Sequence, residues 1–305
     1  MINVSVVVPI YNGEADLPDL IQCLRSQTYP QDRLEYLLVD NNSRDRTAEM
    51  LQTLATDSIR PLSENRIQSS YAARNQGIRI AQGEIVAFTD ADCRPEPQWL
   101  EELIKPFEDP NIGIVVGEIV ALPGETLLEK HADRQDTLSQ KHTIAHKFFP
   151  YGQTANLAIR RHIFEQVGLF RPHLTTGGDA DICWRIQQQT HYKLYFAQDA
   201  IIKHRHRATW RQLRSQWRRY GESNRYLHEL HGVELMRDFT AKDYLYRVGR
   251  WLIKEIPINS IKAIAQKADL VDLLNTPIGL FNLQARCQGQ KQAKLSEKAK
   301  EIEEL

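Results

Sequence analysis

The feature that most constrains the fold of this chain is a repeated alternation of short β-branched apolar runs with amphipathic helical patterns. The run from Val4 to Val8 is followed, from Asp16 onward, by leucine and isoleucine residues at helical spacing, with Pro18 suited to a first turn. The segments "YLLVD" and "EIVAFTD" repeat the strand pattern, each beside a helical pattern. Strands that alternate with helices predict an α/β fold with a doubly wound, mostly parallel sheet flanked by helices.

Polar residues follow three of these predicted strands, in "PIYN", "VDNNSRD" and "TDADC". Ligands of open α/β sheets bind beyond the carboxyl ends of the strands, so these segments are expected to meet at one crevice. The third segment ends in Asp90 and Asp92, whose carboxylates suit Mg²⁺ or Mn²⁺ shared with substrate phosphates. An Asp-x-Asp-x-x-Pro sequence is also ordinary turn chemistry, and the run taken alone favours a turn.

Charge and cysteine content narrow the function further. Lys plus Arg and Asp plus Glu each number 39, so no overall field attracts nucleic acid and an anionic ligand needs a local site. The four cysteines show no paired or metal-type spacing, which fits a reducing compartment. The sequence shows no signal-peptide pattern and no apolar run of membrane-spanning length. A cytoplasmic protein is therefore expected.

Several motifs in order resemble the family 2 glycosyltransferases, which have the GT-A fold. The resemblance begins with "VSVVVPIYNGE", "LLVDNNSRDRT" and "TDADCRPEPQWL", continues through "YGQTANLAIRRHIFEQVGLF", "TTGGDADICWR" and "IKHRHR", and covers roughly residues 3 to 221. It implies a nucleotide-sugar-binding and catalytic domain over residues 1–221 and a helical C-terminal extension over residues 222–305. The implied activity is that of a metal-dependent, inverting, non-processive hexosyltransferase that transfers a sugar from a nucleotide-diphosphate donor in cell-surface polysaccharide or glycolipid synthesis.

The resemblance also implies which residues contact the donor. The nucleotide-sugar contacts would be Pro9, Tyr11, Asn12, Glu14, Asp40, Arg74, Asp90 and Arg219. The metal, Mg²⁺ or Mn²⁺, would be held by Asp92, Asp90 and His204. Turn chemistry for Asp40, a solvated helix position for Arg74 and a lone surface histidine for His204 remain alternatives. Arg219 lies in "QWRRY", a partial match to the Gln-x-x-Arg-Trp motif of processive synthases.

On the acceptor side, the resemblance assigns the catalytic base to Asp179 in "GGDADICWR", where Gly178 replaces the glutamate usual in the family. A helix N-cap is the alternative role for this aspartate. The acceptor, a glycan or lipid-linked sugar, would contact Thr154, Asn156, Asp181 and Trp184. Ordinary strand-turn polarity for Thr154 and Asn156, and a core position for Trp184, are the alternatives.

Two other functional classes stay open at this point. The first is a nucleotide-sugar-binding regulatory protein without activity, which the intact Asp92 and Asp179 disfavour. The second is a nucleotidyltransferase, which needs a basic glycine-rich loop after its first strand, where "PIYNGEADLPDL" is acidic.

The C-terminal third reads as helical from about residue 208, and residues 294–305 are expected to be a solvated helix or a frayed tail. Within it, "DYLYRVGRWLIKE" places Tyr244, Leu245, Val248, Trp251 and Leu252 on one helix face beside Arg247, Arg250 and Lys254. This face suits peripheral contact with the inner surface of the cell membrane. Packing of the same face onto the catalytic domain is the alternative.

Overall fold

The computed structural model describes all 305 residues, and the chain divides into two compact units. Unit 1 comprises Met1–Leu122, Leu138–His204 and Ser296–Leu305, and unit 2 comprises Pro123–Thr137 and Arg205–Leu295. The predicted boundary after residue 221 falls inside α9 (Trp210–His231), a continuous helix of unit 2. The boundary implied by the family resemblance therefore does not coincide with the division by compactness.

Unit 1 contains one mixed sheet whose strands follow the order β3-β2-β1-β4-β7-β6-β8-β5. The strands are β1 (Val4–Ile10), β2 (Leu34–Asp40), β3 (Ile59–Ser63), β4 (Ile85–Phe88), β5 (Cys93–Pro95), β6 (Ile112–Ala121), β7 (Leu157–Arg160) and β8 (Lys193–His204). The first four strands in this order pair in parallel, as do β6 and β8. Strand β7 is antiparallel to β4 and β6, and β5 is antiparallel to β8. The predicted α/β fold is confirmed, as a mixed, mostly parallel sheet.

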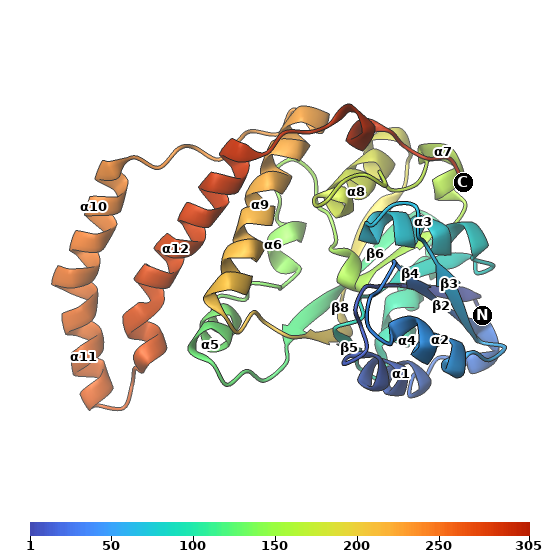
Figure 1. Ribbon diagram of the computed structural model, residues 1–305, viewed down its shortest axis with the longest axis horizontal. Helices are drawn as coiled ribbons and strands as arrows, with labels where there is room; N and C mark the ends of the chain where they lie inside the picture. Colours follow the sequence, from blue (N-terminus) through green and yellow to red (C-terminus); the bar gives the residue numbers. More distant parts are fainter. The chain divides into compact units, whose positions relative to one another are not determined.

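Helices cover both faces of this sheet (Figure 1). The helices of unit 1 are α1 (Leu17–Arg25), α2 (Thr47–Leu54), α3 (Ser70–Ile80), α4 (Trp99–Ile104), α6 (Lys141–Ile144), α7 (Ile163–Val167) and α8 (Gly178–Gln189). Along β1, Val6 and Val8 share a core cluster with the leucines of α1, whereas Val7 points to the other face and touches Gly77 of α3. The two-residue alternation of a strand thus buries β1 between two helical layers.

The edge of the sheet that carries β8 differs from the sequence pattern. In the sequence, Gln198 and Asp199 separate two strand-like runs near residues 192–197 and 200–203, but β8 is one strand from Lys193 to His204. Its pairing with β6 shifts register where Gly117 faces Ala197 and Glu118 faces Ile201. The extra residues of β8 form an irregularity of the β-bulge type. In the sequence, this irregularity interrupts the apolar pattern of the strand.

The C-terminal residues are not a frayed tail. The backbone N–H of Leu169 donates to the carbonyl of Glu303, and the Arg171 guanidinium donates to the carbonyl of Lys300. The Glu303 carboxylate accepts from Asn75 at 3.0 Å and from Arg79 at 2.8 Å. Residues 296–305 therefore form part of unit 1. The charged composition of the tail concealed these specific contacts.

Unit 2 is helical. Its helices are α5 (Leu127–Arg134), α9 (Trp210–His231), α10 (Ala241–Arg250), α11 (Ile256–Ile264) and α12 (Leu270–Gln292), with a π-helical turn at Trp251–Glu255. Helices α9 and α12 pack closely because neither Gly221 nor Gly289 has a side chain, and a Cβ there would collide with the backbone of the other helix. None of the helices combines the length and apolar composition needed to cross a bilayer.

Candidate active site

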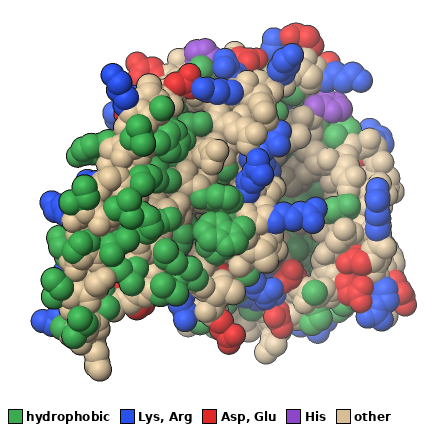
Figure 2. Space-filling view, turned by 60° about the vertical axis from the view of Figure 1, so that its left-hand side comes forward, with side chains coloured by type: hydrophobic (Ala, Val, Ile, Leu, Met, Phe, Trp, Pro, Cys, Tyr) green, Lys and Arg blue, Asp and Glu red, His purple; other side chains and the backbone are tan.

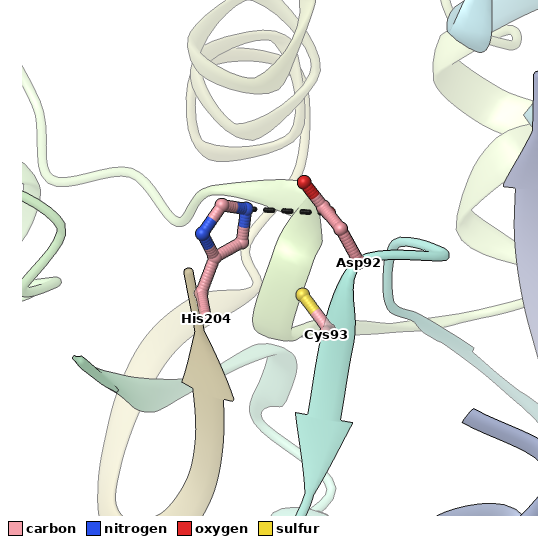
Figure 3. Close-up of side chains that lie close together, drawn as sticks. All are labelled: Asp92, Cys93 and His204. Atoms are coloured by element: carbon pink, nitrogen blue, oxygen red, sulfur yellow. Dashed lines mark ion pairs between the residues drawn. The ribbon is translucent and has the colours of Figure 1, made fainter. Parts of the chain in front are cut away.

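The register between β5 and β8 brings three potential metal ligands together. Cys93 pairs with His204 across these antiparallel strands, and Asp92 directly precedes β5. His204 Nε2 lies 3.3 Å from Asp92 Oδ1, and the ligand atoms of Asp92, Cys93 and His204 all lie within 4.8 Å of one another (Figure 3). Asp92 and His204, two of the three predicted metal ligands, come from distant parts of the sequence and are neighbours in the structure.

The donor set fits a divalent cation of borderline character. A carboxylate beside an imidazole suits Mn²⁺ better than Mg²⁺, which favours oxygen ligands. Burial raises the pKa of the Cys93 thiol well above its ordinary value, and the Asp90 and Asp92 carboxylates raise it further, which disfavours the thiolate that binds metals best. Cys93 could not be found by sequence reasoning, because only the register of two strands places it beside His204.

Asp90, expected at both the donor and the metal, is held by a buried arginine. Arg74 of α3 donates to Asp90 Oδ1 at 2.6 Å, and its side chain is 3% exposed. Arg74 is therefore not a solvated helix residue, and its guanidinium stacks near the ring of Tyr71, 5.6 Å from the centroid. The ion pair lies just beyond the carboxyl end of β4 (Ile85–Phe88) and neutralises the Asp90 carboxylate.

Asp179 lies in the first turn of α8 and accepts a hydrogen bond from Thr154 Oγ1 at 3.0 Å. Burial raises the pKa of the Asp179 carboxyl, Arg74 counteracts this, and the Asp90 charge raises it further. The N-cap of α8 is Gly177, and no side chain caps this helix. The alternative role of Asp179 as an N-cap was therefore wrong, and its carboxylate carries a pKa shifted toward that of a useful proton acceptor.

The backbone before Asp179 explains why glycine replaces the glutamate that the resemblance led us to expect. Gly177 has φ +82°, in the left-handed region that favours glycine. At Gly178, a Cβ would lie 2.7 Å from the ring of Tyr71, and the Gly178 N–H donates to the Tyr71 hydroxyl at 3.0 Å. The Tyr71 ring occupies the space that a glutamate side chain at residue 178 would need.

The ends of β1 and β2 place the remaining predicted donor residues. Asp40 ends β2 in register with Ile10 of β1, and its Oδ1 accepts from the backbone N–H of Ser43 at 3.2 Å. Asn12 adopts φ 52° and its side-chain oxygen accepts from the backbone N–H of Arg44. Asp40 and Asn12 therefore shape the loop between β2 and α2, so the turn role of Asp40 is present in the structure.

Around these loop residues, Pro9 is buried in β1 and Tyr11 is 47% exposed. Glu14 accepts from Arg46 at 2.6 Å, and this hydrogen bond lowers the pKa of its carboxyl. Arg219 lies on α9 of unit 2 and is exposed, so it is not among the residues that unit 1 brings together.

Asp181 does not have the acceptor contact predicted for it. It is 0% exposed, and its two carboxylate oxygens accept from Arg171 and Arg185, each at 3.0 Å. Arg171 in turn donates to the carbonyl of Lys300 in the C-terminal tail. An enclosed carboxylate cannot reach a substrate, so this aspartate anchors the start of α8.

Asn156 is likewise 0% exposed. Its Oδ1 accepts from Trp99 Nε1 at 2.8 Å, and its Nδ2 donates to the carbonyls of Glu118 and Ala200, each at 2.8 Å. These hydrogen bonds connect β6 and β8 to α4. They occupy the side-chain amide of Asn156, so it is not available to bind a sugar. The predicted acceptor contact was wrong for this residue.

Trp184 is a core residue and not a sugar platform. It is 0% exposed, its Nε1 donates to the carbonyl of Phe149, and its ring packs against His146, Phe148 and Tyr151. Thr154, 3% exposed, reaches the site only through its hydrogen bond to Asp179. Of the four predicted acceptor contacts, the structure joins Thr154 alone to the site.

Comparison with known proteins agrees with this geometry. Residues 5–171 match the sequence model of glycosyl transferase family 2. The glycosyltransferase AglE of Haloferax volcanii is 36% identical over 219 residues, which cover 70% of this chain and 71% of the relative. An undecaprenyl-phosphate 4-deoxy-4-formamido-L-arabinose transferase of Pectobacterium atrosepticum is 32% identical over 166 residues, covering 53% of this chain and 50% of that protein.

The fold is shared with a solved enzyme structure, the mannosyltransferase PcManGT of Pyrobaculum calidifontis in complex with GDP-Man and Mn²⁺. That similarity has a TM-score of 0.64 at 18% identity and covers 95% of this chain and 87% of the other. The sheet is therefore of the GT-A type. The family match over more than half of the chain and the similarity to AglE show that the chain is a glycosyltransferase and belongs to glycosyl transferase family 2.

Proposed function

We propose that unit 1 transfers a sugar from a nucleotide-diphosphate donor to an acceptor hydroxyl, with inversion at the anomeric carbon. The observation that carries this proposal is that two carboxylates of unit 1, those of Asp92 and Asp179, have different partners. Asp92 pairs with the imidazole of His204, whereas Asp179 accepts a hydrogen bond from Thr154, and burial raises the pKa of its carboxyl. A displacement at an anomeric carbon needs both an anchor for the leaving diphosphate and a separate base.

Asp92 and His204 would hold a divalent cation, and their chemistry favours Mn²⁺ over Mg²⁺. When bound, this ion neutralises charge on the departing diphosphate. Asp179 takes the proton of the acceptor hydroxyl while that oxygen forms its bond to the anomeric carbon and the bond to the diphosphate oxygen breaks. The Arg74–Asp90 ion pair acts on Asp179 electrostatically, since Arg74 lowers the pKa of the Asp179 carboxyl and Asp90 raises it.

The donor would lie over the ends of β1 and β2. There, the exposed ring of Tyr11 is available to stack on a base, and Pro9, Asn12 and Asp40 fix the loop beside it. A nucleotide-diphosphate sugar is supported through the shared fold by the solved mannosyltransferase, whose complex contains GDP-Man and Mn²⁺.

For the acceptor, we propose a lipid-linked sugar or a growing glycan in polysaccharide or glycolipid synthesis. The support is the relative named for undecaprenyl-phosphate, a polyprenyl carrier. A relative of this kind matches about half of each chain, so the similarity supports the class of acceptor and not the sugar.

The proposal is tested by metal-dependent donor binding. Nucleotide sugars with Mn²⁺ should raise the melting temperature of the wild type, since ligand at a hundredfold its Kd stabilises a folded protein by about 2.7 kcal/mol. Asp92→Asn should remove this stabilisation and reduce transfer by orders of magnitude. Asp199→Asn, a change at an exposed aspartate of β8, serves as the matched control and should behave as the wild type.

Two results would contradict the proposal: full transfer activity after thorough chelation, or an unimpaired Asp92→Asn variant. Donor binding without any transfer or hydrolysis would favour the regulatory alternative. Release of free diphosphate from a nucleoside triphosphate would favour the nucleotidyltransferase.

A further inference from the structure

Unit 2 carries a long helical segment that packs against α12 on one side only. Residues 241–264 comprise α10, the π-helical turn and α11, and they run beside α12 (Figure 1). On the packed side, Trp251 Nε1 donates to the carbonyl of Leu273 at 2.8 Å and Asn259 Nδ2 donates to the carbonyl of Asp272 at 3.0 Å. Trp251, which the sequence pattern grouped with Leu252, therefore faces α12.

The opposite side of this segment exposes large apolar residues. We call it the apolar stripe and define it by Leu245, Tyr246, Leu252, Ile253, Ile261 and Ile264. Ile253 is 81% exposed and Ile264 is 87% exposed. Figure 2 shows hydrophobic side chains gathered side by side on one face of the molecule. Soluble monomers rarely leave so many neighbouring isoleucines and leucines in water, so the apolar stripe needs a partner.

The π-helical turn helps to keep the two halves of the segment in phase. Pro257, at the start of α11, has no N–H to continue the regular ladder, and the wider turn at Trp251–Glu255 absorbs the missing bond. The wider turn rotates α11 about its axis relative to an unbroken helix. As a result Asn259 faces α12 as Trp251 does, and the isoleucines of α11 lie outward with Ile253.

The charge beside the apolar stripe decides what kind of partner fits. Lys242, Lys254 and Lys262 are exposed and form no ion pair. The acids of the same segment are neutralised, because Asp243 pairs with an arginine at 3.0 Å and Glu255 with another at 3.1 Å. The exposed charge is therefore positive. This arrangement complements an anionic surface, whereas a second copy of the chain would bring the same lysines toward one another.

We propose that the apolar stripe docks in the plane of an anionic lipid bilayer, with its leucines and isoleucines among the upper acyl chains and the three lysines at the headgroups. The inference depends only on unit 2 and holds whatever reaction unit 1 performs.

The experiment is flotation of the full chain with liposomes of phosphatidylcholine alone or of phosphatidylcholine with phosphatidylglycerol. Binding to the anionic vesicles is expected at low salt and should weaken as salt screens the lysines. Ile253→Glu combined with Ile264→Glu should reduce binding at least about tenfold, because both apolar contacts are lost. Each Lys→Gln change at residues 242, 254 and 262 should reduce it about fivefold.

Tyr195→Glu, at a residue of β8 that is 48% exposed, is the matched control and should bind as the wild type. Circular dichroism is used to check that each variant is folded. Two outcomes overturn the proposal: no flotation with anionic vesicles at low salt, or sedimentation of the wild type as a dimer that the double isoleucine variant converts to a monomer without any vesicle binding. The second outcome would identify the apolar stripe as a dimer interface.

Discussion

The segments of unit 1 predicted to bind the donor (the donor side) and those predicted to bind the acceptor (the acceptor side) differ in what their polar residues do. On the donor side, Asp92 keeps 34% of its side chain exposed beside His204, and Tyr11 is 47% exposed. On the acceptor side, Asn156 and Asp181 are 0% exposed, and their side chains form hydrogen bonds with other residues of the protein. Both sets lie in motifs of the same family resemblance.

The difference indicates that one motif can contain two kinds of polar residue. Some remain accessible to a ligand, and others are enclosed and stabilise the segment that carries the first kind. Asp179 and Asp181 illustrate this within one helical turn, since one carboxylate is held by a threonine at the site and the other is enclosed by two arginines. Substitutions at the two aspartates should therefore fail in different ways.

The largest effect is expected for Asp179→Asn. An amide cannot accept the proton of the acceptor, so kcat should fall roughly a hundred- to ten-thousandfold, while donor affinity stays near that of the wild type. Donor titration by calorimetry, together with transfer kinetics, measures both quantities. If donor binding fell as much as it does in Asp92→Asn, Asp179 would be a structural residue, and its role would not differ from that of Asp181.

Asp181→Asn should instead destabilise the fold. Removing one partner of a buried ion pair costs about 3 to 5 kcal/mol, and here two arginines lose their carboxylate. Urea denaturation should show the decrease in the free energy of unfolding. At urea concentrations well below the denaturation midpoint, activity per folded molecule should be retained. A variant with unchanged stability but no activity would instead indicate that Asp181 contacts the acceptor.

Asn156→Ala should produce a smaller loss of stability, about 2 kcal/mol, because the Trp99 indole N–H and two backbone carbonyls lose their partner in the core. Thermal denaturation is the measurement. The KM for the acceptor should not change, and a selective rise in that KM would contradict the structural role.

The smallest effect is expected for Thr154→Val, as a shift in pH dependence. The Thr154 hydroxyl donates to the charged form of Asp179, which lowers the pKa of that carboxyl. Without the hydroxyl the pKa rises, so the base becomes deprotonated only at higher pH. The acid limb of kcat/KM should move upward by less than about one pH unit. A limb that stays in place would show that Asp179 does not control it.

The sequence predicted much of the fold because period-two and period-3.6 patterns are local. The strands that end in Ile10, Asp40 and Phe88 and the positions of Asp92 and His204 in motifs needed no knowledge of contacts. The core position of Trp184 was one of two interpretations that the sequence left open, and the structure supports it. The burial of Asp181 could not be predicted, because it depends on a contact with Arg171 of the preceding loop in addition to Arg185 of its own helix. Cys93 was missed for the same reason, since the pairing of β5 with β8 is set far away in sequence.

The return of residues 296–305 to unit 1 has a consequence for how the protein is made. Unit 1 cannot complete its contacts to Asn75, Arg79 and Leu169 until the ribosome has synthesised all of unit 2. Domains that are continuous in sequence fold one after another as they emerge. In this chain, the contacts of unit 1 with its tail form only after synthesis of unit 2, so unit 1 completes its folding late in translation.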